Sequence, residues 1–362
     1  GMGVVSPIGI GCDAYWNSMV EQRSGVVALP PMAEWKLPVF MGGAIKDFEP
    51  KQYVKPRKAL KVMCREIQIG FTAARFAVEQ AQIDPSHTVP ERLGVVFGSE
   101  MMYCDPSEMD DVYGNCIEDG KFHPERWGEV AMAKMYPLWM LMYLPNMTAC
   151  HIGIANDARG PNNTICQGDV SSHLALIEAA SIIARGQADV MIAGGSSSNL
   201  SATAMVYHGT DHLSSRVDSP QQACRPFDAT RDGTVHGEGA AAYVLESEEH
   251  ATARGAPILA RLGGWGIAFG DQATGDRSKQ KAISRSIELS LRRAGLKPDE
   301  IGHLNAHAGG LPDEDAVEAA AIAQVLDVQL VLLAVGCPGT AAWLMPVDTT
   351  LFALKVEPAH GA

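Results

Sequence analysis

Residues 225–240 decide the fold: Arg225-Pro-Phe-Asp-Ala-Thr-Arg-Asp-Gly-Thr-Val-His-Gly-Glu-Gly-Ala240. Charged side chains alternate with glycines along this stretch, and the apolar run 241–245 follows it directly. Short apolar runs bounded by turn residues are typical of buried strands, and glycine lets two backbones approach closely. We therefore predict a close-packed loop, in which Arg231, Asp232 and Glu238 support the scaffold, leading into a buried strand.

Strand and helix patterns alternate on both sides of this stretch. The segments expected to be buried parallel strands are 93–98, 163–166, 188–193, 241–245 and 302–305, with a further strand at 258–262. The segments with helical spacing are 64–82, 170–185, 284–294 and 315–325, and Gly295 is placed to end the third. This alternation predicts an α/β fold with helix-covered sheets.

Two segments depart from the alternation. Residues 101–135 are rich in Met, Asp and Tyr with weak periodicity, so we expect an excursion from the sheets. The methionines of 132–142 fit either ordinary core packing or a flexible apolar pocket or interface. A polar stretch near 249–255 suggests a division into an N-terminal half, 1–250, and a C-terminal half, 251–362.

Composition excludes several classes of protein. The 362 residues are 46% hydrophobic with a formal charge of −13 and no run of Lys or Arg, so we expect no nucleic-acid partner. Eight cysteines without a C-x-x-C pair predict reduced thiols in a cytoplasmic protein. The longest apolar run, 135–144, contains Pro137 and is too short to span a membrane.

Neither a metal nor a cofactor is expected. The pair His208 and His212 has helical ligand spacing but encloses a glycine, which disfavours a helix. The pair His303 and His307 falls on an expected strand, where four residues span about 13 Å, too far for one ion. The Gly-x-Gly pairs lack the strand–loop–helix context of dinucleotide sites.

Four motifs together resemble one family. The RPFD…RDG…GEGA stretch at 225–240, Gly160-Pro161 with 188–195, the opening residues 1–9 and Asn305-Ala306-His307 resemble the beta-ketoacyl-acyl-carrier-protein synthases. The resemblance implies a thiolase-like fold, with two similar α/β halves in a five-layered αβαβα arrangement. It also implies fatty-acid or polyketide assembly, acyl carrier protein as partner, and a dimer.

The resemblance also locates the family's catalytic positions. The nucleophilic Cys, expected where a buried helix begins, falls on Asp169, and counting from either flank gives the same register. The first catalytic His is kept as His307, followed at matching spacing by Pro312, Asp315 and Glu318. The second His falls on Cys337 and the Lys on Leu332, and no Gly-Phe-Gly-Gly loop follows. One of four catalytic side chains remains, so activity is an open question.

Asp169 admits two interpretations. Aspartate is a favoured helix N-cap, so the side chain could cap the helix 170–185 in a retired nucleophile site. Alternatively, it could act as a base or orient His307. Cys166, the nearest thiol, lies in an expected strand, where a small buried cysteine is ordinary.

Two functional hypotheses follow. The first is a non-condensing homologue, either a chain-length-factor-like subunit paired with a competent ketosynthase or a malonyl decarboxylase. The second is an acyl-thioester transferase or hydrolase that uses Cys337 and His307 with Asp169, the residue types of a nucleophilic triad. A plain condensing synthase would require a different register at Asp169.

Overall fold

A six-stranded sheet forms the centre of the N-terminal half in this computed structural model, which describes residues 1–30, 36–83, 88–271, 275–326 and 348–355. The strands, in their order across the sheet, are β2 (Gly9–Ile10), β1 (Met2–Ser6), β10 (Glu238–Glu246), β9 (Val190–Ser198), β5 (Leu93–Gly98) and β8 (Asn162–Ile165). Strands β5 and β9 are buried almost throughout, as expected for short apolar runs covered on both faces.

Strand directions differ in part from the prediction. β5 pairs in parallel with both β8 and β9, as expected, but β10 pairs antiparallel with β9 and with β1. The parallel assignment of 241–245 was therefore wrong, because the connection 199–237 returns the chain to the same end of the sheet. The strand expected at 302–305 is also absent, since this irregular segment packs Leu304 and Ala306 against a helical cluster.

Helices cover both faces of this sheet. α4 (Arg65–Ala81) and α7 (Met147–Ala155) lie on one face, with α4 packed against β1, β9 and β10. α8 (Ser171–Ala184) lies on the other face, against β5, β8 and β9. Both α4 and α8 match the segments predicted from helical spacing to within two residues.

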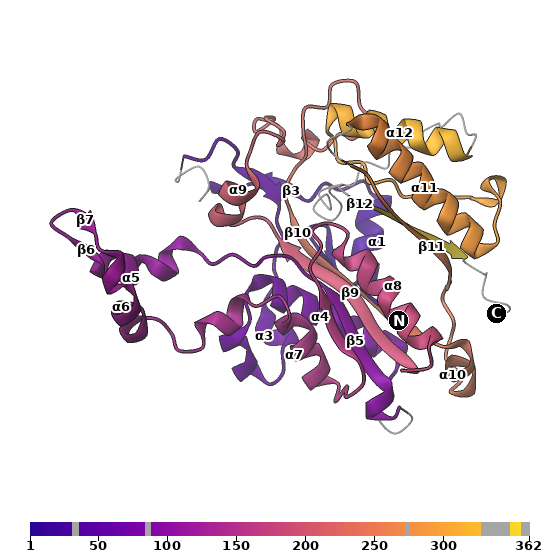
Figure 1. The fold of residues 1–362 in the computed structure, drawn as a ribbon, viewed down its shortest axis with the longest axis horizontal. Coiled ribbons are helices and arrows are strands. Elements are labelled where there is room, and N and C mark those ends of the chain that lie inside the picture. The colour runs from indigo at the N-terminus through magenta and orange to yellow at the C-terminus, as the bar shows by residue number, and fades with distance from the viewer. Residues whose placement is uncertain (31–35, 84–87, 272–274, 327–347, 356–362) are drawn as a thin grey trace.

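A second sheet completes the layers. β11 (Arg261–Phe269) pairs antiparallel with β12 (Asp348–Lys355), which also contacts α8. α11 (Asp276–Ala294) packs on both strands, and α12 (Pro312–Leu326) packs on α11. Gly295 ends α11 in the left-handed conformation, as predicted. The order helix, sheet, helix, sheet, helix is the expected five-layered αβαβα arrangement (Figure 1). The division near residue 250 stays a prediction.

The excursion after β5 projects from the body as an arm (Figure 1). It carries α5 (Asp110–Asn115), β6 (Ile117–Glu118), β7 (Lys121–Phe122) and α6 (Trp127–Lys134). Met132 is 88% exposed and Met140 is 64% exposed. Core packing was therefore the wrong interpretation for Met132 and Met140, and the flexible apolar pocket or subunit interface stays a prediction.

The remaining elements are short and lie around the sheets. They are α1 (Cys12–Val20), β3 (Val26–Ala28), β4 (Met41–Gly43), α3 (Pro50–Tyr53), α9 (Ala202–His208) and α10 (Glu248–Ala253). Within the described ranges, no helix combines the length and apolar character that crossing a membrane requires.

Candidate functional site

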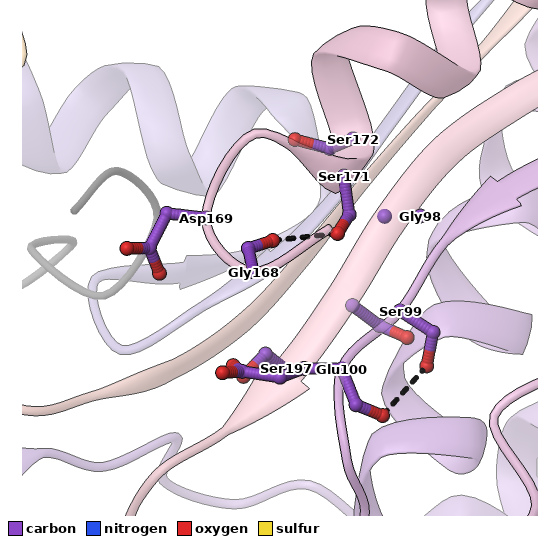
Figure 2. A pocket seen from close by; sticks show the side chains of 10 residues that line it. Gly98, Ser99, Glu100, Gly168, Asp169, Ser171, Ser172 and Ser197 are labelled. Carbon is purple, nitrogen blue, oxygen red and sulfur yellow. Dashed lines mark hydrogen bonds between the residues drawn. The ribbon is translucent and has the colours of Figure 1, made fainter. Parts of the chain in front are cut away.

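A small cavity of about 20 Å³, the space of roughly one water molecule, lies where β5 and β9 end beside the start of α8 (Figure 2). Its walls are three glycines, five serines and two acids: Gly98, Ser99, Glu100, Gly168, Asp169, Ser171, Ser172, Gly195, Ser196 and Ser197. Ligands of α/β sheets commonly bind at the carboxyl ends of parallel strands, which is the position of this cavity. Among the described residues, no apolar side chain and no thiol belongs to its lining.

Asp169 stands on the turn that leads into α8. Gly168 adopts a positive φ of 56°, and the Ser171 hydroxyl donates to the Gly168 carbonyl at 2.5 Å while accepting from the Gln167 amide at 2.8 Å. The helix begins at Ser171 without a side-chain cap, so the predicted N-cap role of Asp169 was wrong. The serine closes the turn itself, and Asp169 is directed away from it (Figure 2).

Two glycines allow the start of α8 to lie directly on the sheet. A Cβ atom at Gly98 would stand 2.4 Å from the backbone nitrogen of Ser172. At Gly195 it would stand 2.6 Å from the Ser172 Cβ. Because these distances are shorter than real Cβ contacts, a larger residue at either position would displace the helix start that carries Asp169.

Cys166 does not supply the missing thiolate. Burial raises the pKa of this thiol, and the negative charge of Glu100 adds to the effect. Burial likewise raises the pKa of Glu100 itself. A thiol becomes a good nucleophile when its pKa falls, so the environment of Cys166 opposes that role. The prediction of a buried cysteine within a strand was wrong, because β8 ends at Ile165 and Cys166 is largely exposed.

His307 lies on an irregular loop held by the helix that follows it. The amides of His307 and Ala308 donate to the two carboxylate oxygens of Glu318 on α12, at 2.7 and 2.9 Å. Ala308 adopts a left-handed φ of 56°, which aims both amides at one carboxylate. Glu318, which the motif spacing had singled out, therefore fixes the backbone of the histidine loop.

Asp315 joins this loop to the stretch 225–240. Its carboxylate, 1% exposed, accepts from the Phe227 amide at 2.7 Å and from the Gly310 amide at 3.0 Å. The Arg231 guanidinium lies 3.2 Å from the same carboxylate and donates to the Pro312 carbonyl at 2.6 Å. The predicted scaffold role of Arg231 is confirmed, and the ion pair connects the two halves.

The other charged residues of the stretch also serve the scaffold, as predicted. Glu238 forms an ion pair with Arg65 at 2.8 Å and accepts from the Ile45 amide at 2.9 Å. Asp232 accepts from the Ser214 hydroxyl and from Arg225, both at 2.8 Å.

His173 is a site residue that the sequence analysis missed. It lies on α8 four residues after Asp169, and its charge acts on His307. Burial lowers the pKa of each imidazole to about 4, and for His307 the neighbouring His173 adds to the effect. Both are therefore neutral at pH 7. The spacing of one helical turn from Asp169 was the available signal.

None of the remaining predicted catalytic positions is among the described residues that line the cavity with Asp169. Cys337 and Leu332 lie outside the described residues. Neither His307 nor His173 lines the cavity beside Asp169. Within the part of the chain that the structure describes, no group of three His, Cys, Asp or Glu side chains is placed to hold a metal ion.

Comparison with known proteins gives the family. Residues 1–251 match the beta-ketoacyl synthase N-terminal domain, and residues 259–337 match the C-terminal domain. A relative, 3-oxoacyl-[acyl-carrier-protein] synthase 2 of Vibrio cholerae, is 32% identical over 329 residues, which are 90% of this chain and 76% of that protein.

Solved structures agree with this match. A beta-ketoacyl synthase from Burkholderia phymatum superposes with a TM-score of 0.77 and 28% identity, covering 90% of this chain and 77% of its own. A type II polyketide synthase ketosynthase, solved in complex with its acyl-carrier protein, has a TM-score of 0.74 and 25% identity over 90% of this chain and 76% of its own. The chain belongs to the beta-ketoacyl synthase family of fatty-acid and polyketide biosynthesis and has its thiolase-like fold.

Proposed function

We propose that this chain is a non-condensing ketosynthase homologue, a chain-length-factor-like subunit that works beside a ketosynthase with an intact nucleophile. The observation that carries the proposal is Asp169. The motif spacing predicts that it takes the nucleophile position at the start of α8, and among the described residues no thiol lines the cavity beside it.

The chemistry of a carboxylate supports this role. A carboxylate is a weak nucleophile toward thioesters compared with a thiolate, and the anhydride it would form is unstable. The nearby His173 and His307 are neutral at pH 7, because burial lowers the pKa of each to about 4. Stable acylation of Asp169 is therefore not expected.

The charges of the cavity favour the subunit role over malonyl decarboxylation. Glu100 and Asp169 line the same small cavity, and the described part of its lining includes no Lys, Arg or His. A malonyl carboxylate placed there would meet two acids without a compensating cation, which is unfavourable at low dielectric.

An exposed basic segment supports a carrier-protein partner. Lys51, Lys55, Arg57, Lys58 and Lys61 are all exposed, and residues 50–61 contain no acid in a chain of net charge −13. Such a patch complements an acidic docking face, and the matched polyketide ketosynthase was solved with its acyl-carrier protein. We place this activity in the cytoplasm, as the reduced cysteines suggest.

The free edge of the large sheet supports pairing with a second ketosynthase. β8 is its edge strand on one side among the described residues, and residues 162–165 are exposed or half-buried. An exposed strand edge can add a strand from another chain. The partner is a second copy of this chain or a condensation-competent homologue.

The second candidate function is transfer or hydrolysis of an acyl thioester. Cys337 with His307 and Asp169 could attack an acyl thioester, with the thiol as nucleophile and the imidazole as base. The retained His307, whose buried Nε2 has no hydrogen-bond partner among the described residues, is the observation that favours it.

The test is tagged expression of the full chain in its native host, followed by purification and mass spectrometry. We expect a ketosynthase with an intact Cys to copurify with the wild type and equally with Asp169→Ala. The purified chain alone, given acyl- and malonyl-carrier thioesters, should show no condensation, no loss of carbon dioxide and no acyl adduct.

Each other result selects a different function. Condensation by the isolated wild type would refute the proposal. Release of carbon dioxide that is lost in Asp169→Ala would establish a decarboxylase instead. A stable adduct that peptide mapping places on Cys337 would establish the acyl-thioester enzyme.

A further inference from the structure

A second and much larger pocket lies between α4 and α7, on the face of the large sheet opposite α8. It has a volume of about 240 Å³, whereas the cavity beside Asp169 has about 20 Å³. α3, which packs against α4, adds Tyr53 to its wall, and the three helices lie together in Figure 1. We call it the α4–α7 pocket, and its lining is Tyr53, Lys55, Phe71, Ala74, Arg75, Val78, Glu79, Ile152, Ala155 and Asn156.

The α4–α7 pocket has an apolar floor and a more exposed mouth. Phe71 is 6% exposed and Ile152 is 1% exposed, so both belong to the core beneath the pocket. Val78 is half-buried and Ala155 is exposed, which places them nearer the mouth. Packed interiors leave few voids larger than one water molecule, and ligand sites combine an apolar lining with a few polar groups. A space of this size over an apolar floor therefore suits the apolar part of a small ligand.

Most polar side chains of the lining are already held in place. The Arg75 Nε atom donates to Glu79 Oε1 at 2.6 Å, and its Nη1 atom donates to the Tyr53 carbonyl at 2.7 Å. These bonds fix the guanidinium between α4 and the end of α3. The side-chain amide of Asn156 donates to the Ile152 carbonyl at 2.8 Å, which fixes it against α7. The polar rim of the pocket is therefore preformed, which lowers the entropic cost of binding a ligand.

Lys55 carries the charge of the lining that is not compensated. Its side chain is exposed, and within the described ranges no acid pairs with its ammonium group. Because Arg75 and Glu79 neutralise each other, the lining as a whole keeps one positive charge. A single cation at the mouth of an apolar pocket complements a ligand with an apolar body and one anionic group. One carboxylate matches this charge, whereas a doubly charged phosphate would need a second cation.

We propose that the α4–α7 pocket binds a small monocarboxylate with an apolar chain, such as octanoate. The chain lies over Phe71 and Ile152, against Val78 and Ala155, and the carboxylate pairs with the Lys55 ammonium group at the mouth. The binding is reversible and involves no covalent step. Because α4 and α8 pack on opposite faces of the sheet, this site is separate from the cavity beside the start of α8. It depends on neither the proposed subunit role nor the alternative thioester chemistry.

The test is isothermal titration calorimetry of the full chain with octanoate at neutral pH. Three analogues separate the contributions, because 1-octanol lacks the charge, octylammonium reverses it and acetate lacks the chain. We expect octanoate to bind with one site per chain and more tightly than 1-octanol, while octylammonium and acetate give no saturable heat. The heat-capacity change of octanoate binding should be negative, because the chain is buried on an apolar floor.

Variants of the lining test the charge and the space separately. Lys55→Gln should weaken octanoate binding about 5-fold, as expected for an exposed ion pair, and leave 1-octanol binding unchanged. Lys58→Gln is the matched control, because it removes the same charge from the same exposed segment outside the lining, and it should change octanoate binding by less than about 2-fold. Ala155→Phe, at an exposed position of α7, should fill the mouth and weaken both ligands by about 10-fold or more.

Several results would overturn the proposal. One is the absence of saturable heat from octanoate with the wild type, and another is binding of 1-octanol, octylammonium or acetate as tight as that of octanoate. Equal losses in Lys55→Gln and Lys58→Gln would assign the effect to the overall charge of the segment instead of the pocket. Wild-type octanoate binding by Ala155→Phe with an unchanged circular dichroism spectrum would exclude the pocket as the site. Should Ala155→Phe fail to fold, Ala155→Leu replaces it with the same expected direction.

Discussion

Asp315→Asn tests the junction that positions the histidine loop. The wild-type carboxylate is 1% exposed, lies 3.2 Å from the Arg231 Nε atom and accepts two backbone amides at 2.7 and 3.0 Å. Asparagine keeps one acceptor oxygen but turns an NH₂ group toward the second amide and leaves Arg231 without its counter-charge. Breaking a buried pair in this way costs about 3–5 kcal/mol of the free energy of unfolding.

The assay is urea unfolding followed by far-UV circular dichroism. With a slope near 3 kcal/mol per molar urea, the loss corresponds to a midpoint lower by about 1 M or more. Asp313→Asn is the matched control, because the same change occurs in the same helical turn at an exposed side chain. Asp313→Asn should lower the free energy of unfolding by at most about 1 kcal/mol, because it removes a negative charge that interacts with the helix dipole. Equal midpoints for the two variants would refute the assigned role of Asp315.

Three further outcomes are expected. The free energy of unfolding should fall as pH drops from 6.5 toward 4, because the folded chain holds His173 and His307 neutral with pKa values of about 4 while the unfolded chain protonates them. Gly98→Ala should cost about 1–3 kcal/mol in thermal or urea unfolding, because its Cβ would overlap the start of α8. Glu238→Gln should cost about 2–3 kcal/mol in the same assays, because it breaks the ion pair with Arg65, where the glutamate side chain is 6% exposed.

Each of these three outcomes has its own control variant. A double variant with Gln at 173 and 307 should reduce the fall in unfolding free energy between pH 6.5 and 4, while His236, whose pKa burial also lowers to about 4, keeps part of it. An unchanged slope would contradict the assignment. Gly128→Ala, where a Cβ meets nothing within 4 Å, should leave stability within about 0.5 kcal/mol. Glu118→Gln breaks an exposed pair with Arg126 and should cost less than about 1 kcal/mol; a larger effect than that of Glu238→Gln would contradict burial as the cause.

Local sequence patterns predicted most of the helices and strands, but they gave one wrong strand direction and one strand that the structure lacks. β5 spans the predicted 93–98, and α11 ends at Gly295 as expected, because strand and helix termination depend on neighbouring residues. The direction of β10 was wrong, because direction follows from the path of the connection 199–237 rather than from the strand's own residues. The segment 302–305 has a strand-like composition but no strand partner within the described ranges.

The candidate site residues could also be predicted only in part from the sequence. Motif spacing singled out His307, Asp315 and Glu318, but their hydrogen-bond partners became known only from the packing of α12 against the loop. The cap predicted for Asp169 failed because Ser171 closes that turn with its own hydroxyl. His173 gave only a helical spacing, and its proximity to His307 depends on residues more than a hundred positions apart.

The sequence by itself determined the family and the αβαβα fold, because these depend on local periodicity and on motifs contiguous in the chain, and it predicts the register that puts Asp169 at the nucleophile position. The tertiary structure alone decided that Asp315 ties the two halves, that the cavity is walled by serines and acids, and that a second pocket forms between α4 and α7. Such contacts join residues distant in sequence, and burial in close-packed layers fixes which of them meet and which charges they can hold.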